Sequence, residues 1–124
     1  MRTLLLIIIT VAPLSSHSAI LKCVVDKKFS AMSDFVYSAK KLKEQKPSVL
    51  IDTDRNIVSR CSFIERLGKV TCDDYEADYV SVARGFVDIK KYYYFNGQFD
   101  VQIFDGNRFI ENNGRGYIAS GKCY

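Results

Sequence analysis

The chain has 124 residues, of which 48% are hydrophobic and 26% are charged, and its formal net charge is +4. This length suits one domain and excludes a multidomain enzyme. The single histidine, His17, falls within a predicted N-terminal targeting segment. A mature chain without histidine excludes Ser-His-Asp and Cys-His catalysis and a histidine general base, so we expect a protein that is not an enzyme.

Residues 1–19 predict a secretory signal peptide. A short basic start is followed by the largely apolar run Leu4–Val11. This run is too short to cross the ~30 Å hydrocarbon core of a bilayer, which takes roughly 20 helical residues. Small residues precede two candidate cleavage points, after Ser18 or after Ala19. We therefore expect a secreted or periplasmic protein in which residues 20–124 form one domain, with no transmembrane segment after the signal peptide is removed.

The cysteines, Cys23, Cys61, Cys72 and Cys123, all follow the predicted signal peptide. An even number of cysteines in a small exported domain predicts two disulfides, for which three pairings exist. A hairpin with residues 65–68 as its loop would place Cys61 directly opposite Cys72, which favours that bond. Cys23 and Cys123 would then join the ends of the domain. The wide cysteine spacing argues against zinc and against a redox motif, and we expect no metal and no cofactor.

The first half of the domain predicts one strand, one helix and one hairpin. Residues 20–29 alternate loosely, as a strand does. Across residues 30–46, apolar positions recur at helical spacing and lysines gather near the end, which predicts a short helix. The segment Phe35–Tyr37 would also continue a strand, so helix and strand both stay open there. Residues 49–58 predict a hairpin with a polar turn at 52–56.

The second half predicts an antiparallel meander. Four apolar-rich runs, at 86–95, 98–104, 108–111 and 117–123, are separated by dipeptides that favour hairpin turns. Residues 71–85 fit a strand and a helix equally well. We therefore predict a mainly β domain, either a small antiparallel barrel or a strongly curved meander sheet, with one short α-helix in its first half and two disulfides.

The turn dipeptide Asn96-Gly97 also predicts a register. A two-residue turn there would pair Tyr94 with Phe99 and Tyr92 with Val101. The upstream apolar residues Val87 and Ile89 would fall on the opposite face of such a strand. We therefore expect the strand to change faces near Lys90-Lys91, by a bulge or a twist.

A candidate interaction surface lies in the same strand, where two basic residues precede three aromatic ones. These residues are Lys90, Lys91, Tyr92, Tyr93 and Tyr94. Basic and aromatic side chains together can bind anionic polymers, although aromatic residues in strands more often pack in the core. In an exported compartment we expect the partner to be a protein or an envelope component and not a nucleic acid. No feature of the sequence indicates an oligomeric state.

Three segments near the C-terminus follow one another in the chain: Asp100–Ile103, Gly106–Phe109 and Gly116–Cys123. Together they resemble the tail of small exported bacterial β proteins of unknown function, in which a last hairpin leads into a terminal Gly-Lys-Cys. The resemblance covers only this end of the chain. It implies an exported β protein and carries no activity.

These features predict a non-catalytic binding or interaction protein, such as an inhibitor or an envelope-associated protein. One alternative is a small-ligand carrier, which requires an apolar cavity inside a barrel. Another is a hydrolase that uses two carboxylates, for which the acidic residues at 73–78 are candidates. A filled interior with an exposed aromatic patch would favour the interaction protein, whereas an apolar cavity would favour the carrier and paired buried carboxylates the hydrolase.

Overall fold

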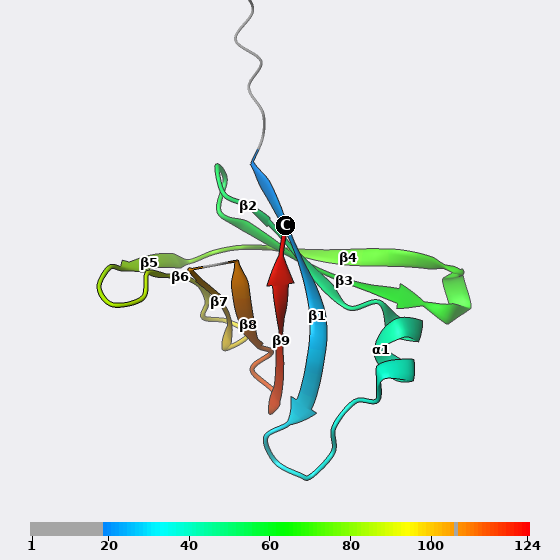
Figure 1. Ribbon diagram of the computed structural model, residues 1–124. Coiled ribbons are helices and arrows are strands. Elements are labelled where there is room, and N and C mark those ends of the chain that lie inside the picture. The colour runs from blue at the N-terminus through cyan, green and yellow to red at the C-terminus, as the bar shows by residue number, and fades with distance from the viewer. Residues whose placement is uncertain (1–18, 106) are drawn as a thin grey trace, which may run out of the picture.

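The computed structural model describes residues 19–105 and 107–124, which form a nine-stranded antiparallel sheet curled into a half-barrel (Figure 1). The strands are β1 (Ile20–Ser30), β2 (Ser48–Asp52), β3 (Ile57–Ile64), β4 (Lys69–Glu76), β5 (Tyr79–Ala83), β6 (Ile89–Tyr94), β7 (Phe99–Phe104), β8 (Arg108–Asn112) and β9 (Tyr117–Cys123). The helix α1 (Ala39–Gln45) follows β1, and the short 3-10 helix η1 (Glu65–Leu67) joins β3 to β4. The strand order is β4-β3-β2-β1-β9-β8-β7-β6-β5. The predicted fold class is confirmed.

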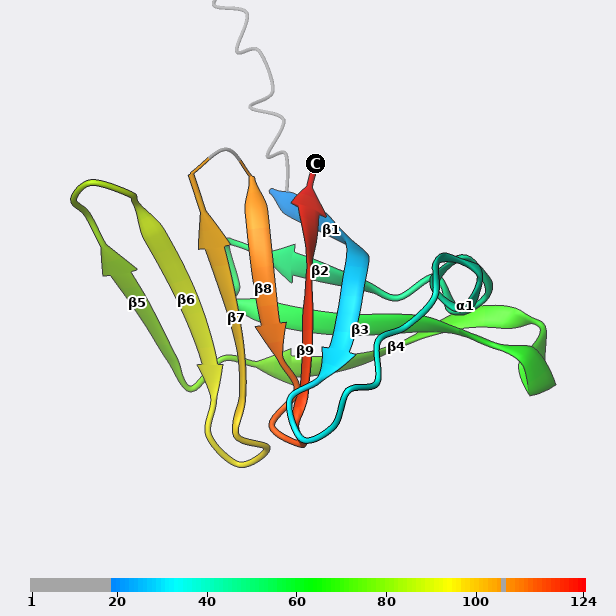
Figure 2. The same cartoon turned by 60° about the horizontal axis from the view of Figure 1, so that its bottom comes forward.

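Strand β1 belongs to both halves of the sheet. Its start, Ile20–Val24, pairs with β2, and the segment Cys23–Ser30 pairs with β9. The register with β9 shifts between Val25 and Lys27, which marks a β-bulge. A bulge bends a strand and increases its twist. As a result, β2, β3 and β4 run across β5 to β9 instead of alongside them (Figure 2).

Strands β4 and β5 are consecutive in the chain but form the two opposite edges of the sheet. Only Ala77 and Asp78 lie between them. The Ala77 amide donates to the Asn56 carbonyl at 2.9 Å, and the Asp78 amide donates to the Tyr93 carbonyl at 2.8 Å. So short a connection requires the sheet to curl until its two edges meet at one end.

The hydrophobic core fills the space between the two halves of the sheet. Its most buried members, each at most 1% exposed, are Cys23, Val49, Ile51, Val58, Tyr92, Val101 and Phe109. The ring of Tyr75 on β4 lies 5.6 Å from that of Phe99 on β7, measured between centroids, so residues of both halves are in contact. Burying a large apolar side chain contributes about 1.5–3 kcal/mol, and this shared core therefore stabilises the curl. We call the core-facing side of the sheet the inner face and the opposite side the outer face.

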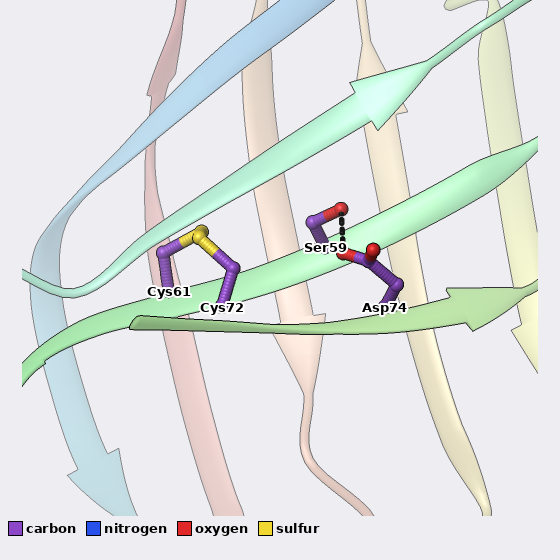
Figure 3. Close-up of a disulfide and its surroundings, with 4 residues drawn as sticks. All are labelled: Ser59, Cys61, Cys72 and Asp74. Carbon is purple, nitrogen blue, oxygen red and sulfur yellow. Dashed lines mark hydrogen bonds between the residues drawn. A yellow bond between two sulfur atoms is a disulfide. The ribbon is translucent and has the colours of Figure 1, made fainter. Parts of the chain in front are cut away.

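Both predicted disulfides are present. Cys23 and Cys123 join β1 to β9 with their Cα atoms 3.9 Å apart, and Cys61 and Cys72 join β3 to β4 at 4.1 Å. Each pair lies directly opposite in the register of its strands. Figure 3 shows the second bridge, beside which the Ser59 hydroxyl is hydrogen-bonded to the Asp74 carboxylate at 2.6 Å.

The predicted register of β6 with β7 is confirmed, since Tyr94 pairs with Phe99 and Tyr92 with Val101. The predicted change of faces near Lys90-Lys91 is wrong. Strand β6 begins at Ile89 and pairs with β7 without interruption through Tyr94. Val87 lies outside the strand, whereas Ile89 is its first residue and, by alternation, lies on the outer face with Lys91 and Tyr93.

The predicted helix over residues 30–46 is confirmed only in its second part. The Ser38 hydroxyl accepts from the Lys41 amide at 3.1 Å and begins α1, which ends at Gln45. The segment 31–38 is neither helical nor part of a long strand; it forms a single bridge, between Val36 and Phe29. Strand β1 continues through Ser30 because β9 pairs with it there. The stabilisation from this pairing outweighs the helical preference that the apolar spacing indicates.

The predicted signal peptide lies outside the described residues, apart from Ala19. Within residues 19–105 and 107–124, no helix has the length and the apolar character that a membrane span requires.

We predict that replacing Cys23 and Cys123 by alanine lowers the free energy of unfolding more than replacing Cys61 and Cys72. The two bridges have sequence separations of 100 and 11 residues. The chain-entropy model gives about 4.7 kcal/mol for a loop of about 100 residues and about 3 kcal/mol for one of about 15. Denaturant unfolding followed by circular dichroism measures both losses. A larger loss from the Cys61 and Cys72 replacement would contradict this ranking.

Candidate functional site

The candidate interaction surface is divided between the two faces of β6. Tyr92 is 1% exposed and belongs to the core. Because side chains alternate along a strand, Lys90 and Tyr94 also lie on the inner face, while Lys91 and Tyr93 lie on the outer face. Tyr94 packs against the core. Of the five predicted residues, only Lys91 and Tyr93 therefore share a face that points away from the core.

An aromatic row continues from Tyr93 on the outer face. Its members are Tyr79, Tyr93 and Phe95, and the ring centroids of neighbours are 5.8 Å and 6.1 Å apart. Tyr79 is 57% exposed and Phe95 is 62% exposed. The Lys91 ammonium lies 4.7 Å from the centre of the Tyr93 ring and 3.6 Å from the Asp100 carboxylate. The row is thus an exposed apolar patch whose neighbouring lysine has a counter-charge.

The aromatic row borders the free edge of the sheet at β5. In the described part of the chain, β5 pairs only with β6, and Figure 2 shows no strand on its other side. Its sequence, Tyr-Val-Ser-Val-Ala, contains neither a charge nor a proline. The opposite edge, β4, carries Lys69, Asp73, Asp74 and Glu76. Charged residues commonly protect edge strands from pairing with other chains, so β4 has this protection and β5 lacks it.

A charged cluster lies on the inner face, where the half-barrel is open. Lys28, Arg60, Asp73 and Glu111 line a cavity of about 210 Å³. The Arg60 Nη2 atom lies 2.6 Å from the Glu111 Oε1 atom, and the Glu111 side chain is only 9% exposed. The guanidinium carbon of Arg60 also lies 4.9 Å from the centre of the Phe99 ring. Sequence reasoning missed this cluster because its members come from four different strands.

Burial lowers the pKa of the Lys28 ammonium below its ordinary value. The Glu111 carboxylate opposes this shift, whereas the positive charges of Arg60 and Lys41 add to it. The Lys28 ammonium also lies 5.0 Å and 5.6 Å from the centres of the Tyr37 and Tyr117 rings. Lys28 thus combines partial burial with two aromatic neighbours.

The charged cluster differs from the site that a two-carboxylate hydrolase needs. Asp73 and Glu111 line the same cavity, but Glu111 is held by Arg60. Glycosidases use two carboxyl groups that both face the substrate, whereas this carboxylate faces a guanidinium. Among the described residues, no three His, Cys, Asp or Glu side chains gather where they could hold a metal ion.

The space deeper between the two halves of the sheet is filled. Where Val58, Tyr75, Tyr92 and Phe99 meet, no room remains for a water molecule. A carrier would need an apolar cavity of about 300–1,000 Å³ at such a place. Within the described residues, the interior at this point is therefore packed with side chains, and the aromatic row lies outside it.

Comparison of the chain with protein-family models, with curated proteins and with solved structures finds no match. The fold and the surfaces therefore define only a class, that of disulfide-bonded antiparallel half-barrels. The resemblance of the C-terminal segment to exported bacterial proteins stays a hypothesis.

We predict that replacing Arg60 by methionine lowers the free energy of unfolding by about 3 kcal/mol, because the buried Glu111 carboxylate then loses its counter-charge. Replacing both Arg60 and Glu111 by apolar residues should restore much of this loss. Urea unfolding of the three variants measures the effect, with Arg66→Met on exposed η1 as the control. An Arg60→Met protein as stable as the parent would contradict a structural ion pair.

We also predict that Lys28 titrates below the ordinary pKa of a lysine, because burial disfavours its charged form. Glu111→Gln should lower its midpoint further, since the carboxylate favours the ammonium, and Arg60→Met should raise it. Nuclear magnetic resonance of isotopically labelled lysine side chains measures these midpoints. A midpoint that neither substitution moves would show that Lys28 does not share the cavity with these charges.

Proposed function

We propose that this protein is a secreted or periplasmic, non-catalytic binding protein that recognises an extended segment of a partner protein as an additional strand beside β5. The observation that carries the proposal is the uncharged free edge of β5 next to the aromatic row. An extended peptide that joins such an edge gains main-chain hydrogen bonds, and contacts with alternate side chains give specificity.

Two sets of side chains would contact the added strand. On the outer face, Tyr79 offers an exposed ring beside Tyr93. On the inner face, Val80 packs against the core, whereas Val82 is 58% exposed. On the outer face Lys91 is paired with Asp100, so this face of the region offers apolar contact rather than net charge. The partner segment we propose is therefore extended, uncharged and rich in apolar residues.

The proposed location rests on the disulfides. Two disulfides suggest an oxidising compartment, outside the cell or in a periplasm. Export through a signal peptide at residues 1–19, cleaved after Ser18 or Ala19, is part of the proposal. An inhibitor or an envelope-associated protein would both meet extended segments of other proteins in these compartments.

The test is a search for peptide ligands by display on the immobilised mature protein, followed by amide hydrogen exchange of the complex. We expect peptides that alternate apolar residues to protect the amides of β5. Val82→Glu should weaken their binding at least tenfold, because it places a charge on the edge that the peptide would cover. Lys90 faces this position across the strand pair and offers the new carboxylate an opposite charge within the fold. Val70→Glu, on the opposite edge strand β4, is the matched control and should bind as the parent does.

Two results would overturn the proposal. One is protection of amides elsewhere than in β5 and β6, with Val82→Glu still binding. The other is self-association through β5 in sedimentation experiments, abolished by Val82→Glu, with no peptide selected; the partner would then be a second copy of the chain.

A further inference from the structure

A second surface lies on the other half of the sheet, where α1 packs beside β1. Between the helix and the strands β1, β2 and β4 runs a groove of about 550 Å³. Its apolar lining consists of Val24, Val25, Ala39, Leu42, Pro47 and Val70. Figure 1 shows α1 beside β1 and β3, on the opposite side of the molecule from β5.

The apolar lining of the groove is left open to solvent. Val24 is 40% exposed and Val70 is 48% exposed, although they come from strands far apart in the sequence. Leu42, on α1, is partly buried and contacts the edge of the core. Because burial of methylene groups is favourable, an alkyl chain that covered Val24 and Val70 would gain much of its affinity from these contacts.

The rim of the groove is positively charged. Lys22, Lys43 and Lys46 line it, and all three are exposed. In the described part of the chain, none of the three takes part in an ion pair. The only acidic residue of the lining, Asp26, lies 3.8 Å from the Arg108 guanidinium. A ligand with a negative head would therefore meet three lysines and one partly neutralised carboxylate.

We infer that the groove binds a single-chain anionic amphiphile, specifically an alkyl carboxylate of the fatty-acid kind. Its chain would lie against Val24, Leu42 and Val70, and its head would lie among the lysines. The apolar lining argues against a small inorganic anion, which would leave it uncovered. The groove volume lies in the range of sites that hold one small molecule. This inference does not depend on the partner proposed for β5.

The test uses dodecanoate below its micelle concentration and the folded mature protein. Isothermal titration measures affinity, and amide chemical shifts locate the ligand. We expect saturable binding with shifts concentrated at residues 22–26, in α1 and at Val70. Acetate, which lacks the chain, and dodecyltrimethylammonium, which has the opposite charge, should not bind at the same concentrations.

Two pairs of variants test the two parts of the site. Val70→Glu places a negative charge in the groove and should weaken binding of dodecanoate at least tenfold, whereas Val82→Glu on the other edge strand should not. Lys22→Gln combined with Lys43→Gln should also weaken binding at least tenfold. The matched control, Arg84→Gln with Arg115→Gln, removes the same charge from exposed positions elsewhere and should leave affinity unchanged. If Val70→Glu does not fold, the variant with Lys22→Gln and Lys43→Gln still tests whether the groove binds dodecanoate.

Three outcomes would overturn the inference. Equal binding of the cationic amphiphile would show adsorption to apolar surface only. Shifts outside the groove would place the ligand elsewhere. Binding to vesicles of anionic lipid without binding to monomeric dodecanoate would identify a membrane-surface contact instead of a ligand site. Because Val82→Glu and Val70→Glu exchange their roles between this test and the test of β5, failure of one proposal is distinguishable from failure of the other.

Discussion

The pairing of β1 with two different neighbours is the constraint on which the rest of the structure depends. Its start pairs with β2 and its end with β9, and the bulge at Asp26 turns one part against the other. The close approach of β9 needs glycine at position 121, where a Cβ atom would collide with the Val24 carbonyl and the Phe109 ring. The Cys23–Cys123 bond then fixes the two strands beside the bulge. Bent in this way, one continuous sheet encloses a core between its own two halves.

The curl also determines where binding can take place. Apolar side chains fill the interior, and the charges that lie near its open end, such as Arg60 and Glu111, are paired with each other. The two proposed binding surfaces therefore lie away from the interior, at the β5 edge with its aromatic row and at the groove beside α1. These two surfaces lie on different halves of the sheet and differ in chemistry, since one is uncharged and the other combines an apolar lining with lysines. Both remain accessible at the same time.

Much of the fold follows from local patterns. The Cys61–Cys72 bridge, the meander and the pairing of Tyr94 with Phe99 were all predictable, because hairpin register depends on residues close in the chain. The Cys23–Cys123 bridge followed only as the remaining pair. The helix over 30–46 was only partly predictable. Apolar spacing there suits a helix, but pairing of β1 with β9 and the cap at Ser38 determine that α1 begins at Ala39. The candidate surface at 90–94 was recognisable as a segment, whereas its division between two faces depends on the core that Tyr92 enters.

The sequence by itself determined the meander of the second half, its turns and the favoured Cys61–Cys72 pair, because each depends on alternation and spacing over short stretches, and it left residues 71–85 open between strand and helix. Only the tertiary structure decided that β4 and β5, adjacent in the chain, become opposite edges, and that β5 is the edge without charges. It also brought Val24 and Val70 to one groove and Lys28, Arg60 and Glu111 to one cavity. The physical reason is that a period of two residues assigns side chains to alternate faces, while the curvature of the sheet determines which distant residues those faces bring together.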